Sequence, residues 1–498
     1  MSTIRKKGII TTIFIYVGFL LGALNTFLYF KFKPEQVGLT RVLLDIAVLF
    51  SSFTLLGSNT VVTKFYPYYR SHHKEQKSDL LTIAFAISTV GFLILMALHT
   101  ILEPTIIRKF SGKSPLLVNY FFLAYPLAFF LTMFQVLEAE TWNLQKAPLS
   151  NFLKEVAFRF FNTILIFLFL GGIISFHIYA HLFSWQYAGI FFILLFYLMY
   201  KKELNMSFRI STLTKRLWKK MLPYSLFILG GNVITILSTT IDAIVISSLK
   251  GLDFAAVFMI SQYITSIIVV PQRTATSIAS PVISQAWKDK DMFKLASVYR
   301  KTSLNLLIAS TFIFTMIWLN YDDLFRMVKT DPIYLLGKPV VLILGLQQIV
   351  EMGTGLNSAI IITSRRWKFE LYSNIILLAC TIPLTYILIK EFGMIGAACA
   401  TLLSRTIFNA LRFGFLLKVY NLQPFSYKTL VALVIPVVVY ALVHFTINFS
   451  NPLLNMIVRS ALFAGIYGYL ILQLRVSEDV QQVFGTIKKR IRNLAGRN

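Results

Sequence analysis

Two charged side chains lie deep in long apolar stretches of the sequence and are the first candidates for chemistry. Arg273 follows Pro271 within "IIVVPQRTATSIASPVIS", and Glu351 lies near the middle of another apolar stretch. A charge at the centre of a bilayer costs about 2.5–3.5 kcal/mol, so each residue needs a polar cavity or a partner. A guanidinium binds phosphate oxygens bidentately and stays charged when buried, whereas a buried carboxylate is protonated more readily. We expect Arg273 to bind an anion and Glu351 to be a coupling site; the alternative is that they pair with each other and lock two helices together.

Several weaker candidates have the same residue types but a simpler explanation. Arg41 and Asp45 are one helical turn apart, so a local ion pair is the simpler interpretation and an outer gate pair the alternative. Asp242 ends a polar stripe of a predicted helix, where cavity lining and an interhelical contact explain it equally well. Three more polar residues join this group. Glu138 is a second candidate for a coupling carboxylate, Arg405 a further candidate for anion binding and Gln348 a candidate polar contact. Arg159 is either another anion-binding residue or a side chain that snorkels to the cytoplasmic interface.

The elements that must position these residues are long apolar helices. The chain has 498 residues, of which 56% are hydrophobic and 14% charged, whereas soluble globular proteins have about 45–50% apolar residues. A membrane-spanning helix needs about 20 mostly apolar residues. We therefore predict an all-α polytopic membrane protein with about fourteen spans: residues 9–31, 38–63, 80–102, 116–139, 152–173, 179–200, 221–248, 253–282, 300–319, 336–363, 369–389, 392–416, 428–449 and 453–474.

The formal net charge of +27 is distributed unevenly between the predicted loops. Loops on the side of the N-terminus carry about three times as many lysines and arginines as the opposite loops, and such an excess marks the cytoplasmic side. We therefore predict a multi-pass protein of the bacterial inner membrane with both termini in the cytoplasm. Nucleic-acid binding, the other explanation for a strongly basic chain, is disfavoured because no basic soluble domain is long enough to hold it.

An internal repeat organises the predicted spans. The motif Gln135-Val-Leu-Glu138 recurs as Gln348-Ile-Val-Glu351, 213 positions later, and Glu155 recurs as Glu370 at an offset of 215. The repeat covers six helices, an even number, so both copies have the same orientation in the membrane. We predict an N-terminal six-helix lobe, a C-terminal six-helix lobe, two additional helices and a basic cytoplasmic tail at residues 1–205, 206–420, 421–475 and 476–498.

Motifs for catalysis are absent from the sequence. We find no phosphate-binding Walker A motif, no dinucleotide-binding glycine pattern and no cysteine–histidine spacing typical of a metal site. We therefore expect no enzymatic activity, no cofactor and no metal.

Three long segments of the sequence resemble a known family of transporters. They are "TTIDAIVISSLKGLDFAAVFMISQYI", "ASPVISQAWKDKDMFKLASVYRKTSLNLLIAS" and "EFGMIGAACATLLSRTIFNALRFGFLLKVYNLQPFS". They are similar to polysaccharide flippases, which move O-antigen or other lipid-linked oligosaccharides and belong to the multidrug/oligosaccharidyl-lipid/polysaccharide exporter superfamily.

The resemblance implies two six-helix lobes around a central cavity that opens to one side at a time. Two further helices are typical of the branches that move lipid-linked sugars. In the branch that moves the peptidoglycan precursor, an arginine on the eighth helix meets the lipid pyrophosphate, and Arg273 matches that position. The paired arginines on the first helix of that branch have no counterpart here, which argues for another lipid-linked glycan.

The expected function is translocation of an undecaprenyl-pyrophosphate-linked oligosaccharide, such as a lipopolysaccharide precursor, from the cytoplasmic to the outer leaflet by alternating access. In this hypothesis Arg273 holds the diphosphate, and Gln348 and Asp242 meet the sugars. The expected partners are the lipid-linked substrate, membrane lipids, a glycan polymerase and glycosyltransferases. A cation-coupled exporter of drugs or metabolites with the same fold is the first alternative. A membrane-embedded glycan polymerase or glycosyltransferase is the second, supported only by Asp322 and Asp323 in a predicted outer loop.

Overall fold

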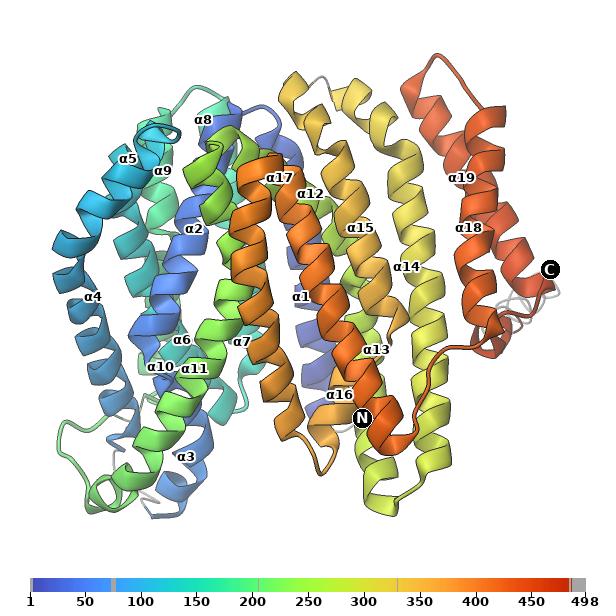
Figure 1. Cartoon of the computed structure of the whole chain (residues 1–498). Coiled ribbons are helices and arrows are strands. Elements are labelled where there is room, and N and C mark those ends of the chain that lie inside the picture. The colour runs from blue at the N-terminus through green and yellow to red at the C-terminus, as the bar shows by residue number, and fades with distance from the viewer. Residues whose placement is uncertain (1–2, 73–77, 205, 329, 483–484, 486–498) are drawn as a thin grey trace, which may run out of the picture. The chain divides into compact units, whose positions relative to one another are not determined.

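Helices joined by short loops make up the chain (Figure 1). The computed structural model describes residues 3–72, 78–204, 206–328, 330–482 and 485, so most of the predicted basic tail lies outside the described residues. Within these ranges the chain divides into two compact units, Met1–Met259 and Ile260–Asn498. The predicted all-α architecture is confirmed.

The first unit contains eleven α-helices and most of a twelfth in the part of the chain that the structure describes: α1 (Thr3–Tyr29), α2 (Pro34–Leu55), α3 (Ser58–His72), α4 (Leu80–Phe110), α5 (Pro115–Tyr120), α6 (Ala124–Asn143), α7 (Ala147–Asn151), α8 (Phe158–Leu170), α9 (Phe176–Ser184), α10 (Gln186–Tyr200), α11 (Thr212–Leu249) and the start of α12 (Leu252–Ser266). A 3₁₀ turn (Phe121–Leu123) joins α5 to α6, and a π-helical turn (Phe152–Ala157) joins α7 to α8.

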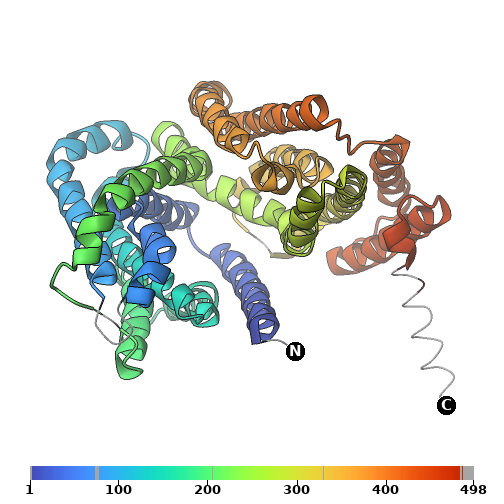
Figure 2. The same ribbon diagram turned by 90° about the horizontal axis from the view of Figure 1, so that it is seen from below.

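The second unit contains the end of α12 and, within the described ranges, seven more helices: α13 (Val270–Asp289), α14 (Met292–Val328), α15 (Lys338–Gly353), α16 (Asn357–Thr363), α17 (Lys368–Tyr420), α18 (Tyr427–Thr446) and α19 (Pro452–Gln473). Two 3₁₀ turns, Ile267–Val269 and Pro332–Gly337, precede α13 and α15. Viewed from below, several helices within each unit are seen nearly end-on (Figure 2).

Eleven helical segments among the described residues are long and apolar enough to cross a membrane, so the chain is a multi-pass membrane protein. One of them, α17, is two limbs joined at Gly393, where the backbone leaves helical geometry at φ 61° and ψ −138°. The two limbs lie side by side in Figure 1, and they correspond to the predicted spans 369–389 and 392–416. The count of fourteen spans stays a prediction.

Several predicted spans are interrupted, and the hydropathy pattern does not reveal three of these interruptions in particular. Residues 38–63 break at Leu56 and Gly57, which both have positive φ, and a Cβ on Gly57 would come within 2.5 Å of a backbone oxygen of Ser225. Residues 253–282 pass through a 3₁₀ turn before Pro271, which occupies the first turn of α13. Proline is accommodated there because N–H groups in the first turn of a helix have no acceptor within the helix, so no hydrogen bond is lost. Residues 336–363 break at Gly355, whose φ is +68°.

In the first unit, α2 is the helix against which α11 and the start of α12 pack closely. Gly38 on α2 faces the backbone of Leu252 so closely that an added Cβ would overlap its carbonyl. We therefore expect Gly38→Ala to destabilise the protein by about 1–3 kcal/mol, the usual cost of overpacking a tight contact. Gly189→Ala is the matched control, because no atom lies within 4 Å of the position that its new methyl group would take, and alanine favours a helix by up to about 1 kcal/mol. Thermal unfolding in detergent measures both, and equal melting temperatures would contradict the expectation.

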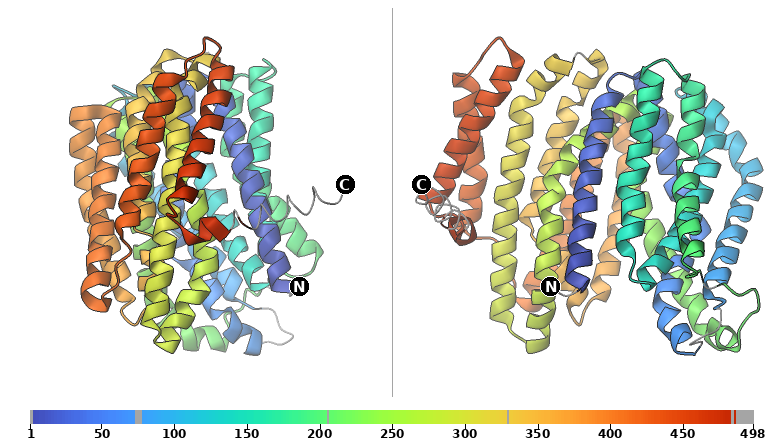
Figure 3. Two further views of the ribbon diagram at one scale, coloured as in Figure 1. Left: turned by 90° about the vertical axis from the view of Figure 1, so that its right-hand side faces the viewer. Right: turned by 180° about the vertical axis from the view of Figure 1, so that it is seen from behind.

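In the second unit, α18 and α19 pack on one side of α14, as Figure 3 shows from two directions. Their shared core contains Leu307 and Phe314 of α14, Val439 of α18 and Phe463 of α19. Tyr467 of α19 also hydrogen-bonds the backbone oxygen of Ile308 at 3.0 Å. The last two helices therefore form one packed block with α14.

Candidate functional site

A polar cavity of about 420 Å³ lies within the second unit, between α13, α15, α16 and both limbs of α17. Its lining includes two arginines, one carboxylate and several amide groups: Arg405, Arg412, Glu351, Gln272, Asn357, Asn374 and Asn409. Hydroxyl groups of Thr276, Ser280, Ser358 and Thr363 add further donors and acceptors. Such a lining is unusual for membrane-spanning helices, because polar side chains there are costly and normally serve a site or a partner.

The α13 wall of the cavity comes from residues four positions apart. Gln272, Thr276 and Ser280 follow one another at this spacing and line the cavity, as expected for one ridge of a helix. Arg273 follows Gln272 in the first turn of α13, and its side chain is exposed. Glu351 accepts a hydrogen bond from Gln347 at 2.9 Å, and no ion pair joins it to Arg273 in the described structure. The alternative that these two residues lock together is therefore wrong for this conformation.

The break between α15 and α16 shapes a second wall. Asn409 on α17 accepts hydrogen bonds from Thr354 and Asn357, both at 3.1 Å, on either side of the break. Its amide also donates to the backbone oxygen of Arg405 at 3.0 Å. Asn409 thus connects the broken helix to the limb that carries the arginines, with only 2% of its surface exposed.

The sequence interpretation missed an ion pair in the cavity wall. Arg412 is buried, pairs with Glu370 on the other limb of α17, and lies over the ring of Phe408 at 3.7 Å. Ser358 donates a hydrogen bond to the same Glu370 carboxylate at 2.8 Å. The only sequence signal for this pair was the recurrence of Glu155 as Glu370.

Of the candidates in the second unit, Arg405 and Glu351 line the cavity. Arg405 is half-buried, on the same limb of α17 as Arg412. Gln348 is half-buried outside the lining, whereas its neighbour Gln347 is buried and holds Glu351. The arrangement offers guanidinium and amide groups to an anion and hydroxyl groups to sugar-like ligands.

Ion pairs hold four of the candidates in the first unit. Arg41 pairs with Asp45 at 2.7 Å, as the one-turn spacing indicates. Arg159 pairs with Glu155 at 2.6 Å, and Glu138 pairs with Lys154 at 3.2 Å. Asp242 is buried on α11 with 3% of its surface exposed.

The comparison with protein families agrees with this geometry. Residues 4–287 match the family described as "Polysaccharide biosynthesis protein", more than half of the chain. The chain belongs to this family. Residues 228–387 also match the MatE family, and no curated protein sequence matches the chain significantly.

Several solved structures share the fold of this family member. The lipid II flippase MurJ in an inward closed conformation is 16% identical, with a TM-score of 0.73 over 94% of this chain and 100% of that chain. A multidrug resistance MATE family transporter in an inward-facing conformation is 14% identical, with a TM-score of 0.65 over 81% of this chain and 94% of that chain. A MOP superfamily transporter from Pyrococcus furiosus has a TM-score of 0.55 at 16% identity, over 84% of this chain and 95% of that chain.

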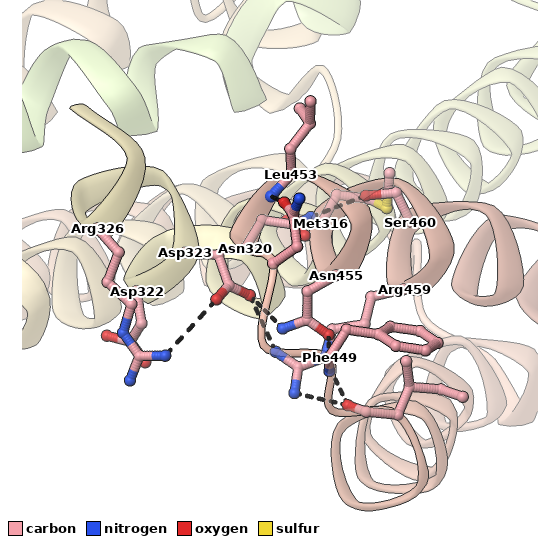
Figure 4. A network of polar contacts seen from close by, with 12 residues as sticks. Met316, Asn320, Asp322, Asp323, Arg326, Phe449, Leu453, Asn455, Arg459 and Ser460 are labelled. Atoms are coloured by element: carbon pink, nitrogen blue, oxygen red, sulfur yellow. Dashed lines mark hydrogen bonds and ion pairs between the residues drawn. The ribbon is translucent and has the colours of Figure 1, made fainter.

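In this member of the polysaccharide biosynthesis family, ion pairs and hydrogen bonds engage Asp323 (Figure 4). Asp323 is 3% exposed and accepts hydrogen bonds from Asn455 at 2.6 Å and Arg459 at 3.2 Å. Arg459 also donates to the backbone oxygen of Ile447 at 2.7 Å, which fixes the loop between α18 and α19. Asp322 pairs with Lys338 at 2.6 Å. The two aspartates are thus engaged in holding helices together.

Proposed function

We propose that the protein is a flippase that moves an undecaprenyl-diphosphate-linked oligosaccharide from the cytoplasmic to the outer leaflet of a bacterial inner membrane. The observation that carries the proposal is the polar cavity in the second unit, which contains Arg405 and Arg412 within membrane-spanning helices. Guanidinium groups suit a diphosphate because they bind its oxygens bidentately and remain charged out of water. Membership of the polysaccharide biosynthesis family supports a glycan as the cargo.

In the proposed mechanism the site is exposed alternately to the two sides of the membrane. Arg405 binds the diphosphate in the cavity, and Arg273, exposed one residue beyond the lining, meets the same group as it passes. Amides and hydroxyls of the cavity, with Gln348 nearby, contact the sugars. Glu351 is the coupling carboxylate in this proposal. Its hydrogen-bond donor, Gln347, is neutral and so does not compensate the charge of the carboxylate.

The candidates of the first unit take supporting roles in this proposal. Arg159 and Asp242 contribute to substrate binding, and Glu138 is a second coupling carboxylate. The Arg41–Asp45 pair serves as an outer gate. Both termini are proposed to be cytoplasmic, with α18 and α19 providing a surface for the lipid tail, and a glycan polymerase and glycosyltransferases acting before and after transport.

A cation-coupled exporter of drugs or metabolites is the second candidate function. The match of residues 228–387 to the MatE family favours it. Arg405 opposes it, because this cavity arginine has no ion-pair partner in the described structure and its guanidinium repels cationic drugs.

Reconstitution distinguishes the two functions. Purified protein is placed in liposomes that contain a fluorescent undecaprenyl-diphosphate oligosaccharide, and loss of signal to an impermeant quencher or lectin is followed over time. We expect protein-dependent movement between the leaflets, and no movement of a cationic dye such as ethidium across the same membranes. Dye transport without glycan movement would replace the flippase proposal by the exporter.

A further inference from the structure

A second hollow, of about 510 Å³, lies at one end of α13 within the second unit. Three cationic side chains line it: Lys288, Lys290 and Arg365. They come from the end of α13 and from the turns before α14 and α17, and all three are exposed. The hollow is therefore a concave, positively charged surface that is open at the surface of the second unit, where an anion can reach it.

No ion pair in the described part of the second unit joins the three cations of this hollow to the acidic residues beside it. Asp289 accepts hydrogen bonds from Gln285 at 2.8 and 2.9 Å, and Asp291 caps α14 by accepting from the backbone N–H of Lys294 at 2.8 Å. Neither aspartate belongs to the lining, which contains no carboxylate among the described residues. The lining itself therefore carries three positive charges and no negative charge, while the two carboxylates lie beside it.

One wall of the hollow is rigid. The indole N–H of Trp287 donates to the backbone oxygen of Ile360 at 3.1 Å, and its ring contacts that of Tyr420 with centroids 4.8 Å apart. This fixed aromatic wall joins α13, α16 and the end of α17. Lysines and arginines that only orient a membrane protein need no such shaped surface, because their effect depends on the side of the membrane on which they lie.

The hollow and the cavity that contains Arg405 share one lining residue. Thr363 lines both spaces. Along α13 the polar residues recur every four positions, with Gln272, Thr276 and Ser280 in the cavity and Ser284 and Lys288 in the hollow. A polar track therefore runs along one helix from the exposed cations to the cavity.

We propose that this basic hollow, formed by Lys288, Lys290 and Arg365, is a loading site that binds the diphosphate group of the lipid-linked substrate before that group reaches the cavity. This inference rests on the proposed function. It explains why the polar track extends beyond the cavity, and why the cations gather around a shaped hollow that adjoins it. The hollow holds the diphosphate first, and Thr363 with the α13 hydroxyls lies on the way to Arg405.

Binding of farnesyl diphosphate to the purified full-length protein in detergent tests the loading site. Titration in an Arg405→Gln background removes the arginine that the proposed function assigns to the diphosphate in the cavity, and we expect binding to the hollow to persist. Adding Lys288→Gln, Lys290→Gln and Arg365→Gln should weaken that binding at least tenfold. The control combines Lys215→Gln, Lys219→Gln and Lys220→Gln, which removes the same charge from exposed positions of α11 and should change the affinity less than twofold.

Each result separates this inference from the proposed function. If the wild-type protein binds farnesyl diphosphate but the Arg405→Gln variant does not, the loading site is refuted and the cavity remains the diphosphate site. If the wild-type protein does not bind it, the proposed function fails as well. Equal competition by phosphatidylglycerol would refute a substrate site in favour of general binding of anionic lipid. Should the triple variant melt early, Arg365→Gln alone must still weaken binding about threefold for the proposal to stand.

Discussion

Replacing Arg405 by glutamine is expected to lower export of the lipid-linked glycan about tenfold to a hundredfold. A hydrogen bond to a charged group contributes about 1.5–3 kcal/mol, and each 1.4 kcal/mol is a factor of about ten in affinity. Arg405 is half-buried, lines the cavity and has no ion-pair partner in the described structure, so its loss leaves the helix packing in place. Glycan on the cell surface, compared at equal amounts of membrane-inserted protein, measures the effect.

Two variants calibrate this result. Arg108→Gln makes the same change at an exposed position in the last turn of α4 and should leave export unchanged. Arg273→Ala tests the exposed arginine beside the cavity and should also reduce export while the protein stays inserted and abundant. Normal export by the Arg405→Gln variant would remove the cavity of the second unit from the mechanism, and normal export by Arg273→Ala would remove Arg273.

Replacing Asp323 by alanine is expected to cost about 3–5 kcal/mol of stability, because it leaves the buried guanidinium of Arg459 without its counter-ion. The side chains of Asp323 and Arg459 are only 5% and 9% exposed. Asn455 also loses its hydrogen-bond acceptor, Asp323. Asn455 positions the loop after α18, because its side-chain oxygen accepts a hydrogen bond from the backbone N–H of Phe449 at 3.3 Å. We expect the packing of α18 and α19 against α14 to weaken first. Faster protease cleavage in the loop between α18 and α19 would measure this loss.

The neighbouring aspartate is the matched control for this prediction. Asp322 pairs with Lys338, but the two side chains are 48% and 35% exposed, and exposed ion pairs contribute about 0–1 kcal/mol. Asp322→Ala should therefore change the melting temperature in detergent far less than Asp323→Ala. Equal effects of the two changes would show that the buried network does not hold the last helices.

The packing of α18 and α19 has a functional consequence. Polar contacts join α19 to α14 at several levels, including Asn320 to Ser460 at 2.9 Å and Thr311 to Tyr467 at 3.2 Å. Since α14 also packs against α13 and α15, which line the cavity, α14 connects the last two helices to the cavity walls. A rearrangement of the cavity walls would be transmitted to them through α14.

Local features of the chain were sufficient to predict much of the fold. Long apolar runs determine the membrane helices, because burying backbone polar groups in lipid requires each segment to satisfy its own hydrogen bonds. The special position of Pro271 and the polar candidates Arg405 and Glu351 were also visible, since a charge in an apolar run is costly wherever the run folds. The short interruptions at Gly57 and Gly355 were not, because they change the backbone without changing the mean hydropathy, whereas the break at Gly393 lies near the predicted boundary between spans 369–389 and 392–416.

The sequence alone thus determined which residues need an explanation, and the tertiary structure decided which partners they have. Glu370 meets Arg412 across 42 residues, and Asp323 meets Arg459 across 136. Glu351, by contrast, is held by Gln347 one turn away. Hydropathy and helical spacing act over a few residues and can be read from the chain, whereas an ion pair between separate helices depends on how those helices pack.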